Sequence, residues 1–500
     1  MFKHVFGATS TSGGLSGGNR ATTRVKIGTA MASREDAPLL TKYAQSDVAR
    51  DEFRHVLLLS GPLVLTAICE YVANSVNAMY TGHLTSESDT VQLLLASNGL
   101  AYLFYVLLLY SFAIGVCTAL DAMCAQAYGR HAVSDILVLL QTAVLCSAVL
   151  CIPMALLCLF AEPIFLLLGQ PAETAAVTAD LLYYMMFGVP FVFGYEINKR
   201  ILQSQNVVYP AVLAGIAGNI VNAVAAYGLM FHTSLGYKGS AVAFSLASAT
   251  YCGVTSYFVY QQDHLAWRGW QLSEALAQLP PFLSLSLFGW IMFVSEFAGV
   301  ALTSVLAGWL PHSNLAIGSN NIFLGFRQVF FMVYMGLGVA STVRVGNALG
   351  ANDPHRAQVA AFQTVGLSAS WALLTSVVMA SVRFVYPQAY TSDADTLALA
   401  AHLMLVNAPF QVVFGIWMVL LGVFRGSAKP HTGAILNCLF ILLLGVPLGW
   451  YLASTRNFGI EGLWLGASVG YIVCAAYGIY WLFTVNWKQM ALEAQATHEA

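Results

Sequence analysis

The feature that most constrains this chain is a series of twelve long apolar runs. Each run is about 20 residues long or longer, which is the length an α-helix needs to cross the hydrocarbon core of a bilayer. Lipid offers the backbone no hydrogen-bond partners, so runs of this kind span a membrane as helices. The predicted spans lie near residues 56–82, 92–124, 136–160, 175–200, 210–231, 239–260, 282–308, 315–345, 357–382, 397–424, 432–453 and 460–485.

Composition agrees with a membrane protein. Charged residues make up 9% of the 500 residues, and 58% are hydrophobic. A soluble domain carries about 25% charged residues, so this chain has too few of them to cover a water-exposed surface. We therefore expect an all-α polytopic membrane protein that is surrounded by a lipid bilayer. The net charge of −2 carries no information about nucleic acid, and we expect no nucleic-acid partner.

The distribution of basic residues predicts the orientation. Near the ends of the predicted spans, twelve Lys and Arg residues lie on the side of the N-terminus and three on the opposite side. Lys199, Arg200 and Arg344 belong to the twelve. Because short loops rich in Lys and Arg stay in the cytosol and the number of spans is even, we expect both termini to be cytosolic.

The segment before the first span has a different composition. It is rich in Gly, Ser, Thr and Arg, which predicts a disordered tail; an organelle transit peptide is the alternative. The expected organisation is a cytosolic N-terminal tail at 1–51, a six-helix lobe at 52–262, a cytosolic linker at 263–280, a second six-helix lobe at 281–486 and a cytosolic C-terminal tail at 487–500.

The two halves of the chain look like copies of one another. The first predicted span aligns with the seventh without a gap, and later spans of the first half also resemble their counterparts in the second half. Six spans per copy make both copies enter the membrane in the same direction, related by an axis along its normal, as in two-lobed secondary transporters. The matched pairs include Glu70 with Glu296, Gln126 with Asn347, Gly129 with Gly350 and Pro190 with Pro409.

One face of the first predicted span is polar. Glu70, Asn74 and Asn77 recur at helical spacing, so they lie on one side of the helix. Glu70 falls near mid-depth, where a carboxylate is costly unless it meets water or a partner, and such groups mark transport pathways. We expect Glu70 and its counterpart Glu296 to take up and release protons as access alternates between the two sides.

Further polar residues at membrane depth are candidates for the cavity lining. Asn219 and Asn222 either line it or only hydrogen-bond one helix to another. Arg327 needs a partner, and Glu296 is the acid at similar depth, which suggests an ion pair. If that pair forms, Glu296 stays ionised and Glu70 is the better proton carrier. The candidate substrate-binding residues are Asn74, Asn77, Asn219, Asn222, Trp290 and Arg327.

Several functional classes lack their motifs. The sequence has no GxxxxGK[ST] phosphate-binding loop and no HExxH cluster, and its nine cysteines form no CxxC pair. We expect no enzyme activity, no cofactor and no metal site. Uphill transport is then driven by an ion gradient, of protons or of sodium.

Several motifs together resemble one known family. GPLVLTAICEY with MYTGHL, ALDAMCAQAYG, RILQSQNVVYP, STVRVGNALGAND and GVFRGSAKP occur in order. They are similar to elements of the multidrug and toxic compound extrusion family, in its eukaryotic branch, over residues 52–486. The resemblance implies a V-shaped cleft between two lobes and a proton- or sodium-coupled antiporter that exports organic cations, xenobiotics or secondary metabolites. It also implies a vacuolar, lysosomal or plasma membrane location; we expect a monomer.

The resemblance assigns a coupling and cation-binding role to Glu296, the first acid of the seventh span. Other positions depart from the family pattern. Glu70 stands where relatives often have Gln, and Asn77 stands where bacterial members have Asp. These differences shift the expected chemistry toward the first span and, with Arg327, leave an organic-anion exporter and a lipid-linked flippase open as alternatives. Acids or Gln of the family are replaced at Ala301, Ala348, Phe414 and Trp417.

Overall fold

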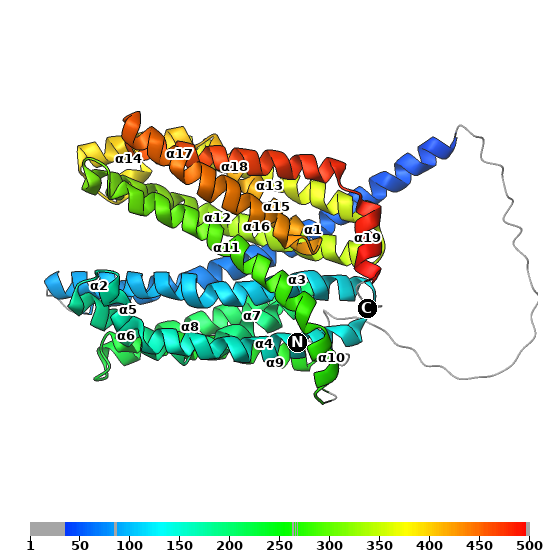
Figure 1. Ribbon diagram of the computed structural model, residues 1–500, viewed down its shortest axis with the longest axis horizontal. Helices are drawn as coiled ribbons and strands as arrows, with labels where there is room; N and C mark the ends of the chain where they lie inside the picture. Colours follow the sequence, from blue (N-terminus) through cyan, green and yellow to red (C-terminus); the bar gives the residue numbers. More distant parts are fainter. Residues whose placement is uncertain (1–35, 85–87, 263–264, 266, 268, 497–500) are drawn as a thin grey trace, which may run out of the picture. The chain divides into compact units, whose positions relative to one another are not determined.

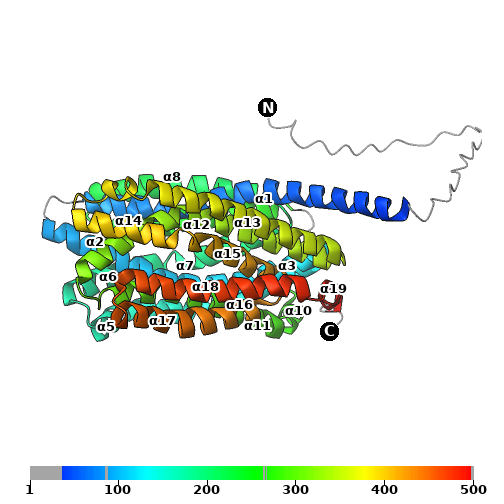
Figure 2. The same ribbon diagram turned by 90° about the horizontal axis from the view of Figure 1, so that it is seen from above.

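The computed structural model describes residues 36–84, 88–262, 265, 267 and 269–496, and within them it contains helices and no strand. Contacts divide the chain into two units, Met1–Asp47 and Val48–Ala500. The first unit contributes the described start of helix α1, from Asp36. The second unit contains every other helix, and its long helices run roughly along one direction (Figures 1 and 2).

The first half of the large unit, which begins at Val48 within α1, forms one lobe, and this lobe ends at Tyr260. Its elements are α1 (Asp36–Gly82), α2 (Ser88–Phe104), the π-helical turn η1 (Tyr105–Tyr110), α3 (Ser111–Gly129), α4 (Val133–Leu159), α5 (Ala161–Leu167), α6 (Ala172–Met186), α7 (Val189–Ser204), α8 (Tyr209–Phe231) and α9 (Lys238–Tyr260).

The second half forms the other lobe after the short helix α10 (Leu272–Ala277). Its elements are α11 (Leu279–Ala307), α12 (Ser313–Gly350), α13 (Pro354–Val382), the 3-10 turn η3 (Tyr386–Ala389), α14 (Ala394–Asn407), α15 (Phe410–Gly426), α16 (Pro430–Leu436), the π-helical η4 (Asn437–Gly445), α17 (Val446–Trp450), the π-helical η5 (Tyr451–Thr455) and α18 (Gly459–Thr484). A last helix, α19 (Trp487–Ala496), follows.

The twelve predicted spans are confirmed as helices. Ten helices of the described residues are long and apolar enough to cross a membrane, and two bent pairs supply two more. The pairs are α6 with α7, bent by 53°, and α14 with α15, bent by 58°. Pro190 and Pro409 stand beside these breaks, where a residue without a backbone N–H interrupts the helical ladder. The bends therefore recur at matching places in the two halves.

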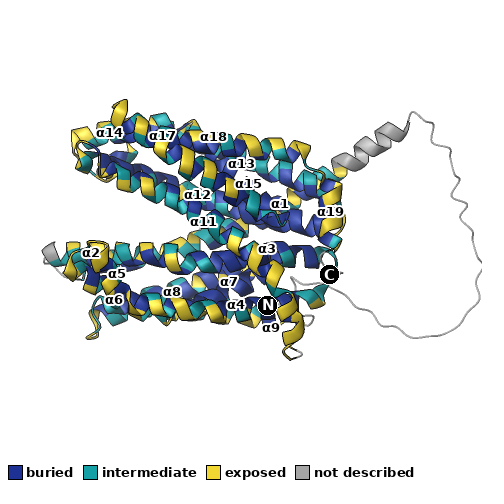
Figure 3. Ribbon diagram, viewed as in Figure 1, coloured by how far each residue is buried: buried dark blue, intermediate teal, exposed yellow. Residues whose placement is uncertain are grey.

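Each lobe has its own apolar core, and large apolar side chains also cover the outside. Val149, Val224, Leu443 and Phe483 are exposed on helices of membrane-spanning length. Water-soluble proteins rarely expose such extended apolar surface, so these faces contact lipid. Buried residues are concentrated along inner helices such as α3, as Figure 3 shows.

The lobes meet closely at the end where α3, α12 and α15 finish, called the proximal end below. A Cβ atom added at Gly129 of α3 would collide with the carbonyl oxygen of Asn347 in α12. A Cβ atom added at Gly350 of α12 would likewise collide with the carbonyl oxygen of Gln126 in α3. Only glycine permits so close a backbone approach.

The chain segments outside the lobes differ from expectation. The predicted tail at 1–51 includes residues from Asp36 to Asp51, which are helical in the structure; residues 1–35 lie outside the described residues. Ion pairs explain the helix near residue 51, because Glu52 accepts a hydrogen bond of 3.0 Å from Arg344 and also pairs with Arg356. The C-terminal segment forms α19, where Gln495 donates to the carbonyl oxygen of Gly350.

Candidate functional site

Glu70 of α1 is engaged by a buried cation of the same lobe. Its Oε1 accepts a hydrogen bond of 2.7 Å from the Tyr195 hydroxyl and one of 2.7 Å from Lys199 Nζ. Lys199 also donates to Glu196 Oε1 over 2.6 Å. The side chain of Lys199 is 4% exposed, so it is an internal cation and not the helix-end marker that the sequence analysis counted.

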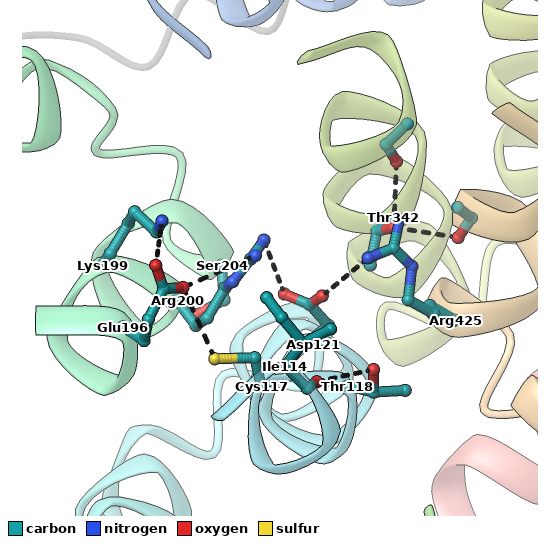
Figure 4. A network of polar contacts seen from close by, with 12 residues as sticks. Ile114, Cys117, Thr118, Asp121, Glu196, Lys199, Arg200, Ser204, Thr342 and Arg425 are labelled. Carbon is teal, nitrogen blue, oxygen red and sulfur yellow. Dashed lines mark hydrogen bonds and ion pairs between the residues drawn. The ribbon is translucent and has the colours of Figure 1, made fainter. Parts of the chain in front are cut away.

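The charges continue from Glu196 to the boundary between the lobes (Figure 4). Arg200 lies 3.8 Å from Glu196 and 3.5 Å from Asp121 of α3. Asp121 in turn lies 3.7 Å from Arg425 of α15, in the other lobe. Three acids and three bases thus alternate from Glu70 to the proximal end, so their formal charges cancel, as buried charges require.

Glu296 of α11 has a very different environment. It is buried, and its Oε1 accepts a hydrogen bond of 2.9 Å from the hydroxyl of Tyr471 in α18. Its Oε2 meets no donor at hydrogen-bond distance, although Trp417 and Asn437 lie close enough to interact with the carboxyl group. None of the ion pairs among the described residues includes Glu296. This carboxylate therefore has an oxygen free for a proton or a cation.

The predicted ion pair between Glu296 and Arg327 is not among the ion pairs of the described residues. The guanidinium of Arg327 lies instead over the Phe414 ring, 3.7 Å from its centroid, and 5.1 Å from that of Trp464. Aromatic faces attract a cation, which explains its position. The condition under which Glu70 would be the better proton carrier is therefore not met.

The asparagines join α8 to α1. Asn219 Nδ2 donates to the carbonyl oxygen of Cys69 over 2.8 Å, and Asn222 Nδ2 donates to Asn77 Oδ1 over 2.9 Å. These are the interhelical hydrogen bonds that the sequence analysis left open as one of two roles. Asn74 is half-buried on the same helix as Asn77. Substrate binding by these residues stays a prediction.

Trp290 of α11 contacts the other lobe. Its indole Nε1–H donates to the hydroxyl of Ser111 in α3 over 3.1 Å, and its ring stacks on Phe112 with the centroids 5.2 Å apart. The side chain therefore joins α11 to α3. Its predicted contact with substrate stays a prediction.

Two cavities are relevant to ligand binding. One of about 10 Å³ lies beside Arg327 in the second lobe and is lined by Gln411, Phe414 and Tyr471, among others. A larger one of about 210 Å³ lies at the proximal end and is lined by Arg130 and Glu274, among others. The larger cavity includes none of the predicted site residues, so we place the candidate site around the buried charges.

Sequence reasoning missed several partners of the predicted residues. Asp121 lies within the quoted motif ALDAMCAQAYG as its one charged residue, and that isolated acid was a usable signal. Lys199 follows Glu196 by three residues, a spacing that favours an ion pair within the helix, but nothing in the sequence indicates its contact with Glu70. Nothing in the sequence marks Tyr471 as the partner of Glu296, because the two residues are 175 positions apart.

Comparisons with known proteins agree with this architecture. A family model described as MatE matches residues 62–228 and 290–451. Multidrug and toxin extrusion protein 2 of Oryctolagus cuniculus is 32% identical over 89% of this chain and 73% of its own length. The chain belongs to the MatE family. Protein DETOXIFICATION 16 of Arabidopsis thaliana is 29% identical over 89% of this chain and 90% of its own length. The crystal structure of the eukaryotic MATE transporter AtDTX14 shares the fold, with a TM-score of 0.83 at 22% identity over 90% of this chain and 99% of that one.

Membership of the MatE family makes this chain a multi-pass membrane transporter of the multidrug and toxin extrusion type, and not an enzyme. Two positions where it departs from the expected family pattern lie beside the candidate site. Phe414 supplies the ring under Arg327. Trp417 is fully buried and donates to Asn437 Oδ1 over 3.0 Å. In this MatE chain, aromatic side chains therefore occupy positions where the resemblance implies an acid and a Gln.

Proposed function

We propose that this chain is a secondary active antiporter that exports an organic solute in exchange for protons, with Glu296 as the residue that binds the transported proton. The supporting observation is the state of its carboxylate, which has one oxygen bonded to Tyr471 and the other without a partner. A proton or an organic cation can neutralise such a group, but not both at once. Competition between the two couples their movement in opposite directions.

Glu70 has a second role in this proposal. Its hydrogen bonds with Tyr195 and Lys199 hold it in a network that reaches the lobe boundary. A proton arriving at Glu70 would remove one negative charge beside Lys199, and the ion pairs from Glu196 to Arg425 would adjust to that change. We therefore propose that Glu296 carries the transported proton and that Glu70 links protonation to opening of the proximal end.

The solute is an organic molecule of the kind named by the relatives, which are multidrug and toxin extrusion proteins. We further propose that the proximal end and both termini face the cytosol, in agreement with the distribution of Lys and Arg. The membrane is then vacuolar, lysosomal or plasma membrane, and the chain works as a monomer. The energy source is the proton gradient, with no cofactor.

Transport by the purified protein in liposomes tests the proposal. We expect an imposed pH gradient to drive movement of N,N,N-trimethyl-2-naphthylammonium, a cationic aromatic probe, and an imposed sodium gradient to have no effect. Glu296→Gln is expected to abolish the response to the pH gradient and to weaken binding of the cationic probe, because the amide neither binds the transported proton nor neutralises a cation. Glu70→Gln is expected to slow transport without removing that response. A pH response that persists in Glu296→Gln, or transport driven by sodium alone, would overturn the assignment.

A further inference from the structure

Arg327 differs from the other buried basic residues of this chain. Among the described residues, Lys199, Arg200, Arg344 and Arg425 are buried and each has an acidic partner within ion-pair distance. Arg327 is 8% exposed and belongs to none of the ion pairs of the described residues. A buried cation without an anion is costly, so a residue kept in this state has an open place for a counter-ion.

The surroundings of Arg327 supply hydrogen-bond donors. The small cavity beside it is also lined by Gln411, which is 3% exposed; its Nε2 meets no acceptor at hydrogen-bond distance, and its side chain interacts with the nearby Tyr334 hydroxyl. Arg327 and Gln411 therefore bring N–H donors to the lining of the same cavity. A carboxylate, sulfonate or phosphate accepts such hydrogen bonds, and a guanidinium matches its geometry.

The walls of the same cavity are aromatic. Phe323, Phe410, Phe414, Trp464 and Tyr471 line it, and Phe414 and Trp464 hold the guanidinium. An anion attached to a flat aromatic body would place its charge on Arg327 and its ring among these side chains. The cavity measures about 10 Å³, which is room for a small group of atoms, so the aromatic body requires the side chains to rearrange.

We propose that Arg327 and Gln411 form a binding subsite for the anionic group of an aromatic organic solute. This inference rests on one part of the proposed function, namely that the transport route brings the solute to the second lobe. The cationic probe and the anion would then use different residues, Glu296 for the one and Arg327 for the other. The chain would accept solutes of both charges.

The two residues are coupled through Tyr471. Its hydroxyl bonds to Glu296, and its ring centroid lies 5.7 Å from the Arg327 guanidinium. Glu296 of α11, Tyr334 of α12 and Tyr471 of α18 are titratable groups that interact electrostatically with Arg327. Cys474 of α18 also interacts with Glu296. A proton on Glu296 removes the negative charge that competes for Arg327. Acidification is therefore expected to strengthen binding of an anion and to weaken binding of a cation.

Binding of three probes that share one aromatic body tests the proposal. The full chain in lipid nanodiscs is dialysed against naphthalene-2-sulfonate, the neutral naphthalene-2-sulfonamide or N,N,N-trimethyl-2-naphthylammonium, at about pH 6 and about pH 8. We expect the sulfonate to bind at least about tenfold more tightly than the sulfonamide. The preference should increase at the lower pH. If the wild-type protein binds the two equally, Arg327 is only a structural cation and the proposal is overturned.

Variants identify the residue responsible. Arg327→Gln is expected to remove the sulfonate preference, and Arg327→Lys is expected to retain part of it. Arg456→Gln is the control and should retain the whole preference, because Arg456 is an exposed arginine near the Tyr451 ring. A preference that survives in Arg327→Gln overturns the assignment. If Arg327→Gln binds none of the probes, Arg327→Lys decides: recovery of cation binding together with part of the sulfonate preference supports an anion site, and recovery of cation binding with no sulfonate preference overturns it.

The outcomes separate this subsite from the proposed function. Sulfonate preference without proton-driven movement of the cationic probe supports the anion subsite and contradicts the antiporter. Proton-driven movement of the cation without sulfonate preference does the reverse. Glu296→Gln is expected to bind the sulfonate with the same affinity at both pH values, since the competing charge is gone. A persistent pH dependence in that variant would overturn the coupling through Tyr471.

Discussion

Gly129 and Gly350 occupy reciprocal positions across the boundary between the lobes. Each lies against a backbone carbonyl of the other's helix, Gly129 against Asn347 and Gly350 against Gln126. The internal repeat of the sequence matches Gly129 with Gly350 and Gln126 with Asn347. The pseudo-symmetry axis of the two copies therefore passes near this contact, where α3 and α12 approach without side chains between their backbones.

Gly350→Ala is expected to widen the proximal end. The added methyl would collide with the carbonyl oxygen of Gln126, a backbone atom that cannot move alone. Spin labels at Ser134 and His355, both exposed near that end of different lobes, would report a longer distance in a background without native cysteines. Gly366→Ala is the matched control, because a Cβ atom there meets nothing within 4 Å. An unchanged label distance in Gly350→Ala would contradict the tight contact.

Asp121→Asn is expected to destabilise the protein by about 3–5 kcal/mol, because it leaves Arg200 and Arg425 buried without their shared anion. Thermal unfolding in detergent measures the loss. The double variant Asp121→Asn with Arg425→Gln should regain part of it, since one unpaired cation is removed. Asp180→Asn is the control, because Asp180 and Lys238 form a more exposed pair, worth about 0–1 kcal/mol.

Lys199→Met is expected to affect two carboxylates at once, since Lys199 bonds to both Glu70 and Glu196. The variant should unfold at a lower temperature than the wild-type protein and show an altered dependence of transport rate on pH. Adding Glu70→Gln should restore part of the thermal stability, because it removes one of the unpaired carboxylates. If the added substitution lowers stability further, Lys199 is not the counter-ion of Glu70.

Glu493 of α19 gives a pH dependence outside the membrane-spanning helices. Its hydrogen bond from Lys429 holds the pKa of its carboxyl below the ordinary value of 4.5. A carboxyl whose pKa is lowered by folding stabilises the folded state above its unfolded pKa, and this contribution is lost as the pH falls through the lowered pKa. Glu493→Gln should therefore speed amide hydrogen exchange in α19 at about pH 7 and match the wild-type protein well below pH 4.5. An equal difference under both conditions would contradict this origin.

Much of the fold was predictable because it depends on local composition. The span near 175–200 and its counterpart near 397–424 were expected from their apolar length, and each is one of the two bent pairs. The bends could be anticipated at Pro190 and Pro409, since proline interrupts a helix wherever it occurs. The helix at Asp36–Asp51 was not predicted, because its polar composition gives no sign of the arginines that pair with Asp51 and Glu52.

The site was predictable only as a set of residues. Glu70 and Glu296 were expected because a carboxylate at membrane depth is rare and costly, whatever lies around it. Their difference was not predictable. Lys199 bonds to Glu70, and Tyr471 bonds to Glu296, and both partners come from helices far away in the sequence.

The amino-acid sequence by itself determined that this chain crosses the membrane as two repeated sets of helices and places a few ionisable groups among them. Length, apolarity and repetition are properties of neighbouring residues, so they can be read without knowledge of packing. Only the tertiary structure decided which charges neutralise one another, leaving Arg327 on aromatic rings and one oxygen of Glu296 without a partner. The physical reason is that electrostatic interactions in a poorly hydrated interior depend steeply on distance and burial, and those are set by helices brought together from both lobes.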